Sequence, residues 1–150
     1  MTREFDFFTG TWDVANRRLT ERLAGCTDWE EFPGVAVGQL AFGGAAHIDE
    51  IVFPTKGWAG LTFRLFDPAR ETWSLYWVSS LDGQMQPPLV GRFTNGRGEF
   101  FSDDTFGGRP IRVRFIWSDI TPTSARWEQA FSADGEQTWE TNWFMAFTRR

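Results

Sequence analysis

The residues best suited to chemistry lie together in an apolar stretch, where His47, Asp49 and Glu50 occur within four positions. A histidine titrates near neutral pH and can act as a base or a metal ligand, although a lone histidine at a strand end is more often structural. Neighbouring side chains of a strand point to opposite faces, so Asp49 and Glu50 cannot form a facing pair of carboxylates. Apolar residues flank both positions, and the pattern leaves open which carboxylate faces inward. We take Glu50 as the candidate.

An inward carboxylate needs a partner, because burying an unpaired charge is very unfavourable. Arg92 and Arg114 could supply that partner. The pair would be either a polar anchor for a ligand or a structural ion pair. Gln129 is a second candidate anchor, since it shares a strand face with Trp127 and Phe131 and a buried amide requires hydrogen-bond partners.

Several other kinds of chemistry leave signatures that the sequence lacks. One histidine and one cysteine exclude zinc sites built from several such residues and an intramolecular disulfide. No nucleophile elbow, phosphate-binding loop or dinucleotide fingerprint is present. A net charge of −5 argues against a nucleic-acid groove. We therefore expect no metal, no cofactor and no nucleic-acid partner, and we assign no catalytic residue.

The composition favours one β-rich domain spanning residues 1–150. Aromatic residues make up 17% of the chain, with nine Trp and sixteen Phe, and they suit strands around a roomy interior. The first residues do not resemble a signal peptide, and no window approaches eighteen apolar residues. A cytoplasmic protein without a membrane partner is the simplest expectation.

The C-terminal stretch gives the clearest structural pattern. Two alternating runs, 126–132 and 138–148, flank an Asp-Gly turn, which is typical of a β-hairpin. The alternation predicts that Glu140 and Asn142 are exposed. It predicts a buried face made of Trp139, Trp143, Met145 and Phe147.

Similar short runs recur along the whole chain and predict about ten strands joined by tight turns. Before the C-terminal hairpin, the expected strands cover residues 11–23, 29–42, 46–53, 58–66, 72–80, 89–94, 99–103 and 111–117. Phe5, Phe7 and Phe8 precede the first strand and are expected to plug one open end. A meander of this size has exposed edges unless it closes, so we predict an all-β, antiparallel, up-and-down barrel. Such a barrel can hold one small ligand.

The first strand begins with Gly10-Thr11-Trp12, which is similar to the Gly-x-Trp signature of calycins, the superfamily of lipocalins and fatty-acid-binding proteins. The resemblance implies that an arginine after the last strand, Arg149 or else Arg150, packs on Trp12. The chain more closely resembles the bacterial calycin-like proteins of the DUF1579 type, whose members have no agreed activity. That likeness includes Asp49-Glu50, Leu65-Phe66-Asp67-Pro68, Trp73-Ser74-x-Tyr76-Trp77 and Pro87-Pro88.

These observations lead to three functional hypotheses. The first is binding of a small, largely apolar or aromatic molecule, with polar anchors and aromatic walls supplied by Glu50, Trp77, Arg92, Gln129 and Trp143. The second is a calycin-like cyclase or isomerase that uses the cavity as a shaped vessel. The third is a filled barrel that acts as an interaction or homodimer module, with Ile116, Phe144 and Ala146 on its outer face. Haem-binding calycins of the nitrobindin kind use a C-terminal histidine, which this chain lacks.

Overall fold

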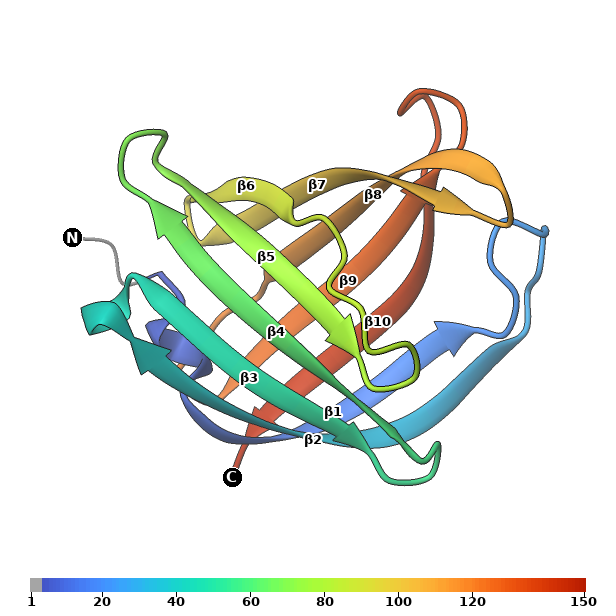
Figure 1. The fold of residues 1–150 in the computed structure, drawn as a ribbon. Helices are drawn as coiled ribbons and strands as arrows, with labels where there is room; N and C mark the ends of the chain where they lie inside the picture. Colours follow the sequence, from blue (N-terminus) through green and yellow to red (C-terminus); the bar gives the residue numbers. More distant parts are fainter. Residues whose placement is uncertain (1–3) are drawn as a thin grey trace.

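The computed structural model describes residues 4–150, and within this range ten antiparallel strands form a closed barrel (Figure 1). The strands are β1 (Gly10–Leu19), β2 (Trp29–Ala41), β3 (Ala46–Phe53), β4 (Trp58–Asp67), β5 (Thr72–Ser79), β6 (Leu89–Thr94), β7 (Arg97–Phe106), β8 (Arg109–Ser118), β9 (Ser124–Ser132) and β10 (Glu140–Arg149). Two 3-10 turns accompany them, η1 (Asp6–Phe8) and η2 (Phe42–Gly44). No helix of the described range is long and apolar enough to cross a membrane.

Each strand pairs with the next one along the chain, and β10 returns to pair with β1. In this closing ladder Trp12 lies opposite Arg149, and Arg18 lies opposite Trp143. Closure leaves each of the described strands with two neighbours, which removes the exposed edges of an open sheet. The predicted all-β, up-and-down barrel is therefore confirmed.

The N-terminal phenylalanines close one end of the barrel, as expected from the sequence. Phe5 and Phe8 are fully buried around η1, which lies at the left end of the barrel in Figure 1. The Phe5 ring packs edge-on against Trp73 with ring centres 4.9 Å apart, and Phe8 packs in the same way against Phe147 at 5.0 Å. The opposite end of the barrel holds a wide opening, bordered by residues of β1, β7 and the 80–88 loop, among others.

Arg149 joins the two ends of the chain, which confirms the contact implied by the calycin signature. Its guanidinium lies 4.3 Å from the centre of the buried Trp12 ring. The same group donates hydrogen bonds to the carbonyl oxygens of Phe7, at 2.6 Å, and of Thr9. Gly10 has a φ of +95°, and an added Cβ would lie 3.1 Å from Arg149 Nη1. The glycine of the signature is thus needed for backbone conformation and for space.

A β-bulge in β10 changes the face assignments predicted for the C-terminal hairpin. Thr141 pairs with Ala130 and Trp143 pairs with Gln129, so Asn142 is an extra residue between them. Trp143, Met145 and Phe147 are buried as predicted. Asn142, predicted to be exposed, is fully buried, and Glu140 is half-buried rather than exposed. The predicted inward position of Trp139 is also wrong, because one extra residue moves the preceding side chains to the other face.

Trp139 instead lies outside the barrel, half-buried against the guanidinium of Arg114 at 4.4 Å and the ring of Phe101 at 6.2 Å. The outer face named for partner contacts is also more covered than expected. Ile116 is only 2% exposed, and the Arg126 guanidinium lies 4.8 Å from the Phe144 ring. Ile116 and Phe144 therefore do not form an open apolar patch.

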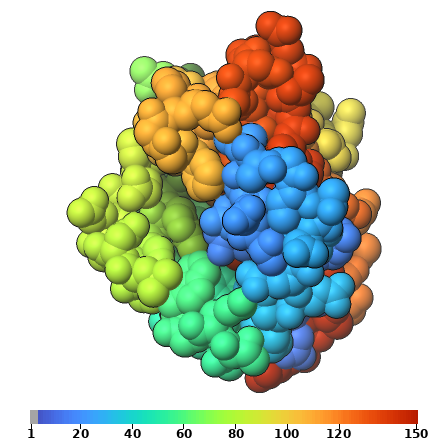
Figure 2. All heavy atoms as spheres, turned by 90° about the vertical axis from the view of Figure 1, so that its right-hand side faces the viewer, coloured from blue at the N-terminus to red at the C-terminus, as the bar shows by residue number. Residues whose placement is uncertain are grey.

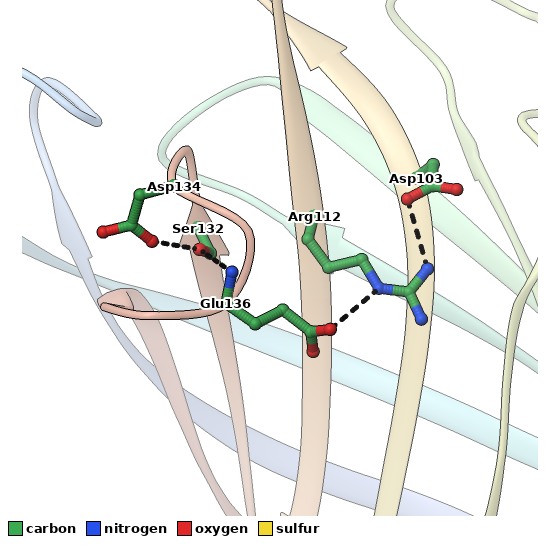
Figure 3. A network of polar contacts seen from close by, with 5 residues as sticks. All are labelled: Asp103, Arg112, Ser132, Asp134 and Glu136. Atoms are coloured by element: carbon green, nitrogen blue, oxygen red, sulfur yellow. Dashed lines mark hydrogen bonds and ion pairs between the residues drawn. The ribbon is translucent and has the colours of Figure 1, made fainter.

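A polar network fastens the loop after β9 to the strands beside it (Figure 3). Arg112 of β8 donates to Asp103 of β7 at 3.3 Å and lies 4.0 Å from Glu136 in the loop. Ser132 donates to Asp134 at 2.9 Å and accepts from the Glu136 amide at 2.9 Å. The network holds this loop against the open end of the barrel.

Candidate functional site

The interior of the barrel holds two connected spaces, an inner chamber and a wider mouth. The chamber has a volume of about 60 Å3 for the centres of water-sized molecules, and the mouth has about 450 Å3 by the same measure. Figure 2 faces the open end and shows a hollow between the 80–88 loop, in yellow-green, and the β1–β2 loop, in blue. Four side chains border both spaces and form a neck between them: Trp77, Phe115, Gln129 and Trp143.

The floor of the chamber is polar, although its walls are apolar. Asp49 of β3 lies opposite Thr62 of β4, His47 lies opposite Arg64, and all four side chains are buried. Arg64 Nη1 donates to Asp49 Oδ1 at 2.5 Å and contacts His47 Nδ1 at 3.0 Å. Asp49, Thr62 and Arg64 border the chamber directly. A ligand that enters the chamber therefore meets a buried ion pair and a threonine.

The protonation of His47 follows from its two partners. Its Nε2 lies 2.8 Å from the carbonyl oxygen of Phe8, which can only accept a hydrogen bond, whereas the Arg64 guanidinium can only donate. The neutral tautomer with the proton on Nε2 satisfies both. Burial, and next the positive charge of Arg64, lower the pKa of His47 to about 3, against the opposing effect of the Phe8 hydrogen bond. His47 thus stays neutral and connects the floor to the plug.

Within this ion pair, two opposing effects act on the pKa of Asp49. Burial raises the pKa of the Asp49 carboxyl, and the Arg64 guanidinium counteracts that rise. The guanidinium also lies 5.0 Å from the Phe5 ring centre and 5.4 Å from that of Phe8. Its Nε is buried and has no hydrogen-bond partner within residues 4–150. The floor can therefore donate hydrogen bonds to a polar group of a ligand in the chamber and can accept hydrogen bonds from it. Such bonds would fix the orientation of the ligand.

Two of the residues chosen from the sequence do not face the interior. Glu50 is exposed on the outer face of β3, and Asp49 occupies the inward position, so our choice between the two carboxylates was wrong. Arg92 is exposed and borders a shallow surface groove with Arg97 and Glu99. Arg114, the other partner considered, also lies outside. The inward partner is Arg64, which the sequence reading did not identify.

The other three chosen residues come together at the neck. Trp143 Nε1 donates to Asn16 Oδ1 at 3.0 Å, and Gln129 Nε2 donates to Asn142 Oδ1 at 3.0 Å. The β10 bulge makes the second contact possible because it turns Asn142 inward. Trp77 lies directly over Gly60 of β4, where an added Cβ would be 1.9 Å from the indole ring. The neck is thus built from side chains whose positions are fixed by neighbours.

The mouth contains two arginines that the sequence reading did not select. Arg18 and Arg22 border the mouth together, and the Arg18 guanidinium lies 4.3 Å from the centre of the Trp143 ring. The sequence pattern does indicate an inward position for Arg18, because Arg18 continues the inward alternation of Trp12 and Asn16 along β1. The β1–β2 loop that carries Arg22 has no such periodicity.

Within the described part of the chain, no group of three or more His, Cys, Asp or Glu side chains is placed to hold a metal ion. No protein-family model matches the chain, and no curated protein is significantly similar to it.

Proposed function

We propose that the barrel binds one small, largely apolar or aromatic molecule, which enters through the mouth and passes between the aromatic side chains of the neck. The observation that carries the proposal is the inner chamber with aromatic walls and a polar floor, joined to a wide entrance. Ligand sites are typically concave and apolar, with a few polar groups that fix orientation. Gln129 at the neck and Asp49, Thr62 and Arg64 at the floor are the groups that would do so.

The volumes limit the size of the ligand. A cavity needs roughly 10–15 Å3 on this measure to hold one water, so the chamber of about 60 Å3 accepts a small group rather than a whole drug-sized molecule. The mouth adds about 450 Å3. A ligand of one or two rings would place a small polar end at the floor, its flat body in the neck and the remainder in the mouth.

We further propose that the chain is a calycin-like barrel of the kind that DUF1579-type proteins form. The closed antiparallel barrel, the plug, and the Arg149 contact with Trp12 agree with that assignment. Calycin barrels hold small ligands in their interiors, so this assignment and the proposed function are compatible.

The proposal is tested with phenylnaphthylamine, an uncharged aromatic probe whose fluorescence rises in apolar surroundings. We expect saturable binding by the wild-type protein. Trp77→Ala should weaken binding about tenfold, because it removes one flat wall of the neck, a loss of roughly 1.4 kcal/mol.

Trp139→Ala is the matched control. It removes the same side chain, which is also half-buried but lies on the outside of the barrel. Binding by this variant should stay within twofold of the wild-type value. Equal losses in the two variants, or no saturable binding by the wild-type protein, would refute the proposed function.

A further inference from the structure

The entrance of the barrel is positively charged on the side where the ligand would leave the neck. Arg18 projects inward from the end of β1 and lies over Trp143, a wall of the neck. Arg22 borders the same space, and its guanidinium lies 5.7 Å from the centre of the Phe106 ring. Two cations and two aromatic rings thus share one side of the mouth.

Not every hydrogen-bond donor of the Arg18 guanidinium has an acceptor among the described residues. Its Nε is buried and has no hydrogen-bond partner within the described residues. None of the ion pairs found among residues 4–150 includes Arg18 or Arg22. Glu30 of β2 lies opposite Arg18 and its charge raises the pKa of Arg18, but its carboxylate is bound to Lys56 at 2.5 Å. A desolvated guanidinium without a carboxylate partner is suited to binding an external anion.

The electrostatics agree with this geometry. Burial, and next the charge of Arg22, lower the pKa of Arg18 to about 10, with a smaller opposing effect from Glu30. Arg18 therefore remains charged at neutral pH, in surroundings that disfavour the charge. An anion beside it would relieve both the desolvation and the repulsion from Arg22.

The acidic residues of the mouth are on other elements and are already engaged. Asp82 accepts a hydrogen bond from the Gln84 amide at 3.0 Å, and Asp104 accepts one from the Thr105 amide at 2.7 Å. Asp103 is bound to Arg112 in the network of Figure 3. These carboxylates do not neutralise Arg18, so the mouth keeps one positive and one negative side.

We propose that the ligand is an aromatic organic anion whose acidic group, a carboxylate or sulfonate, is held by Arg18 and Arg22 at the mouth. Its aromatic body lies between Trp77 and Trp143. The inference rests on the proposed function, because it names the class of molecule that the same cavity binds. It places the charged end of the ligand at the entrance, and an uncharged polar end at the floor, where Asp49 already balances Arg64.

Two probes with the same ring system, one uncharged and one anionic, test the inference separately from the proposed function. Anilinonaphthalene sulfonate carries the ring system of phenylnaphthylamine together with one anionic group. We expect the wild-type protein to bind the sulfonate at least tenfold more tightly than the uncharged probe. Arg18→Met should remove most of this preference, measured as the ratio of the affinities for the two probes in the same variant. Arg18→Lys should keep part of the preference, because it retains the charge.

Arg17→Met is the matched control for charge. Arg17 is the adjacent residue of β1, but it points outward and lies 4.1 Å from the centre of the Trp29 ring. This variant should keep the wild-type preference. If both probes bind equally well, or if Arg17→Met lowers the preference as much as Arg18→Met, the inference is wrong and the proposed function stands. If the wild-type protein shows no saturable binding of the uncharged probe, the proposed function itself fails.

Discussion

His47 is the residue that connects the chamber to the plug, and its neutrality has a measurable consequence for stability. The unfolded-state pKa of a histidine is about 6.5, whereas burial lowers that of His47 to about 3 in the folded protein. Between these values the unfolded state binds more protons than the folded state. The free energy of unfolding therefore rises with pH across this window, and stability is lost as pH falls below about 6.5.

His47→Gln isolates this contribution, because an amide can still donate to the Phe8 carbonyl but does not titrate. Between pH 4.5 and 6 the slope of unfolding free energy against pH should be smaller in the variant by up to about 1.4 kcal/mol per pH unit. Chemical denaturation at several pH values measures both slopes. Asp49, whose pKa is raised, gives a slope of opposite sign in both proteins and cancels in the difference. Identical slopes would mean that His47 binds protons equally in the folded and unfolded states, and that folding does not lower its pKa.

The sequence allowed the correct aromatic residues of the neck to be predicted, but not the polar floor. Trp143 and Gln129 lie on strands whose apolar residues mark the inner face. On β3 and β4 the usual burial of apolar side chains and exposure of polar ones is partly reversed. Polar Asp49 and Arg64 face inward, whereas Leu61 is 40% exposed on the outer face. The two faces are distinguished only in the closed barrel, where Asp49 and Arg64 are buried and Glu50 and Leu61 are exposed.

At the scale of elements, the existence of the strands could be predicted from alternation and turn residues, but only some of their ends could. The predicted bounds 46–53 and 89–94 agree with β3 and β6. The first strand was expected to reach Leu23 but ends at Leu19, and the strand expected over 99–103 extends over Arg97–Phe106. The bulge at Asn142 was hidden because an extra polar residue in an alternating run looks the same as a regular one. It appears only when β10 is aligned with β9.

The contact between β4 and β5 at the neck gives a prediction at this scale. Gly60→Ala would place a Cβ about 1.9 Å from the Trp77 ring, so the ring must move. We expect probe binding to weaken at least fivefold and the free energy of unfolding to fall by about 1–3 kcal/mol, the usual range for overpacking.

A double-mutant cycle identifies the cause. In the Trp77→Ala background the clash is absent, so Gly60→Ala should change the free energy of unfolding by less than about 1 kcal/mol. Denaturant unfolding of the four proteins measures the coupling. Additive effects of the two substitutions would show that Gly60 is not needed to seat Trp77.

For the molecule as a whole, the binding site depends on barrel closure, since β1 supplies Arg18 and Asn16 while β10 supplies Trp143 and Asn142. The β1–β10 ladder brings Arg18 opposite Trp143, with Trp12 opposite Arg149 nearer the other end. Arg149 also binds the carbonyl oxygens of Phe7 and Thr9, so a single side chain fastens the first strand, the last strand and the plug.

Arg149→Met should therefore lower the free energy of unfolding by about 2–4 kcal/mol, from the lost cation–π contact and the lost charged hydrogen bonds. Arg150→Met is the matched control, because Arg150 is exposed and pairs only with exposed Asp13, at 3.1 Å. Its effect should stay below about 1 kcal/mol. Denaturant unfolding compares the variants, and phenylnaphthylamine titration shows whether the neck is retained. Similar losses in the two variants would mean that Arg149 does not close the barrel, and that the β1–β10 ladder holds the neck without it.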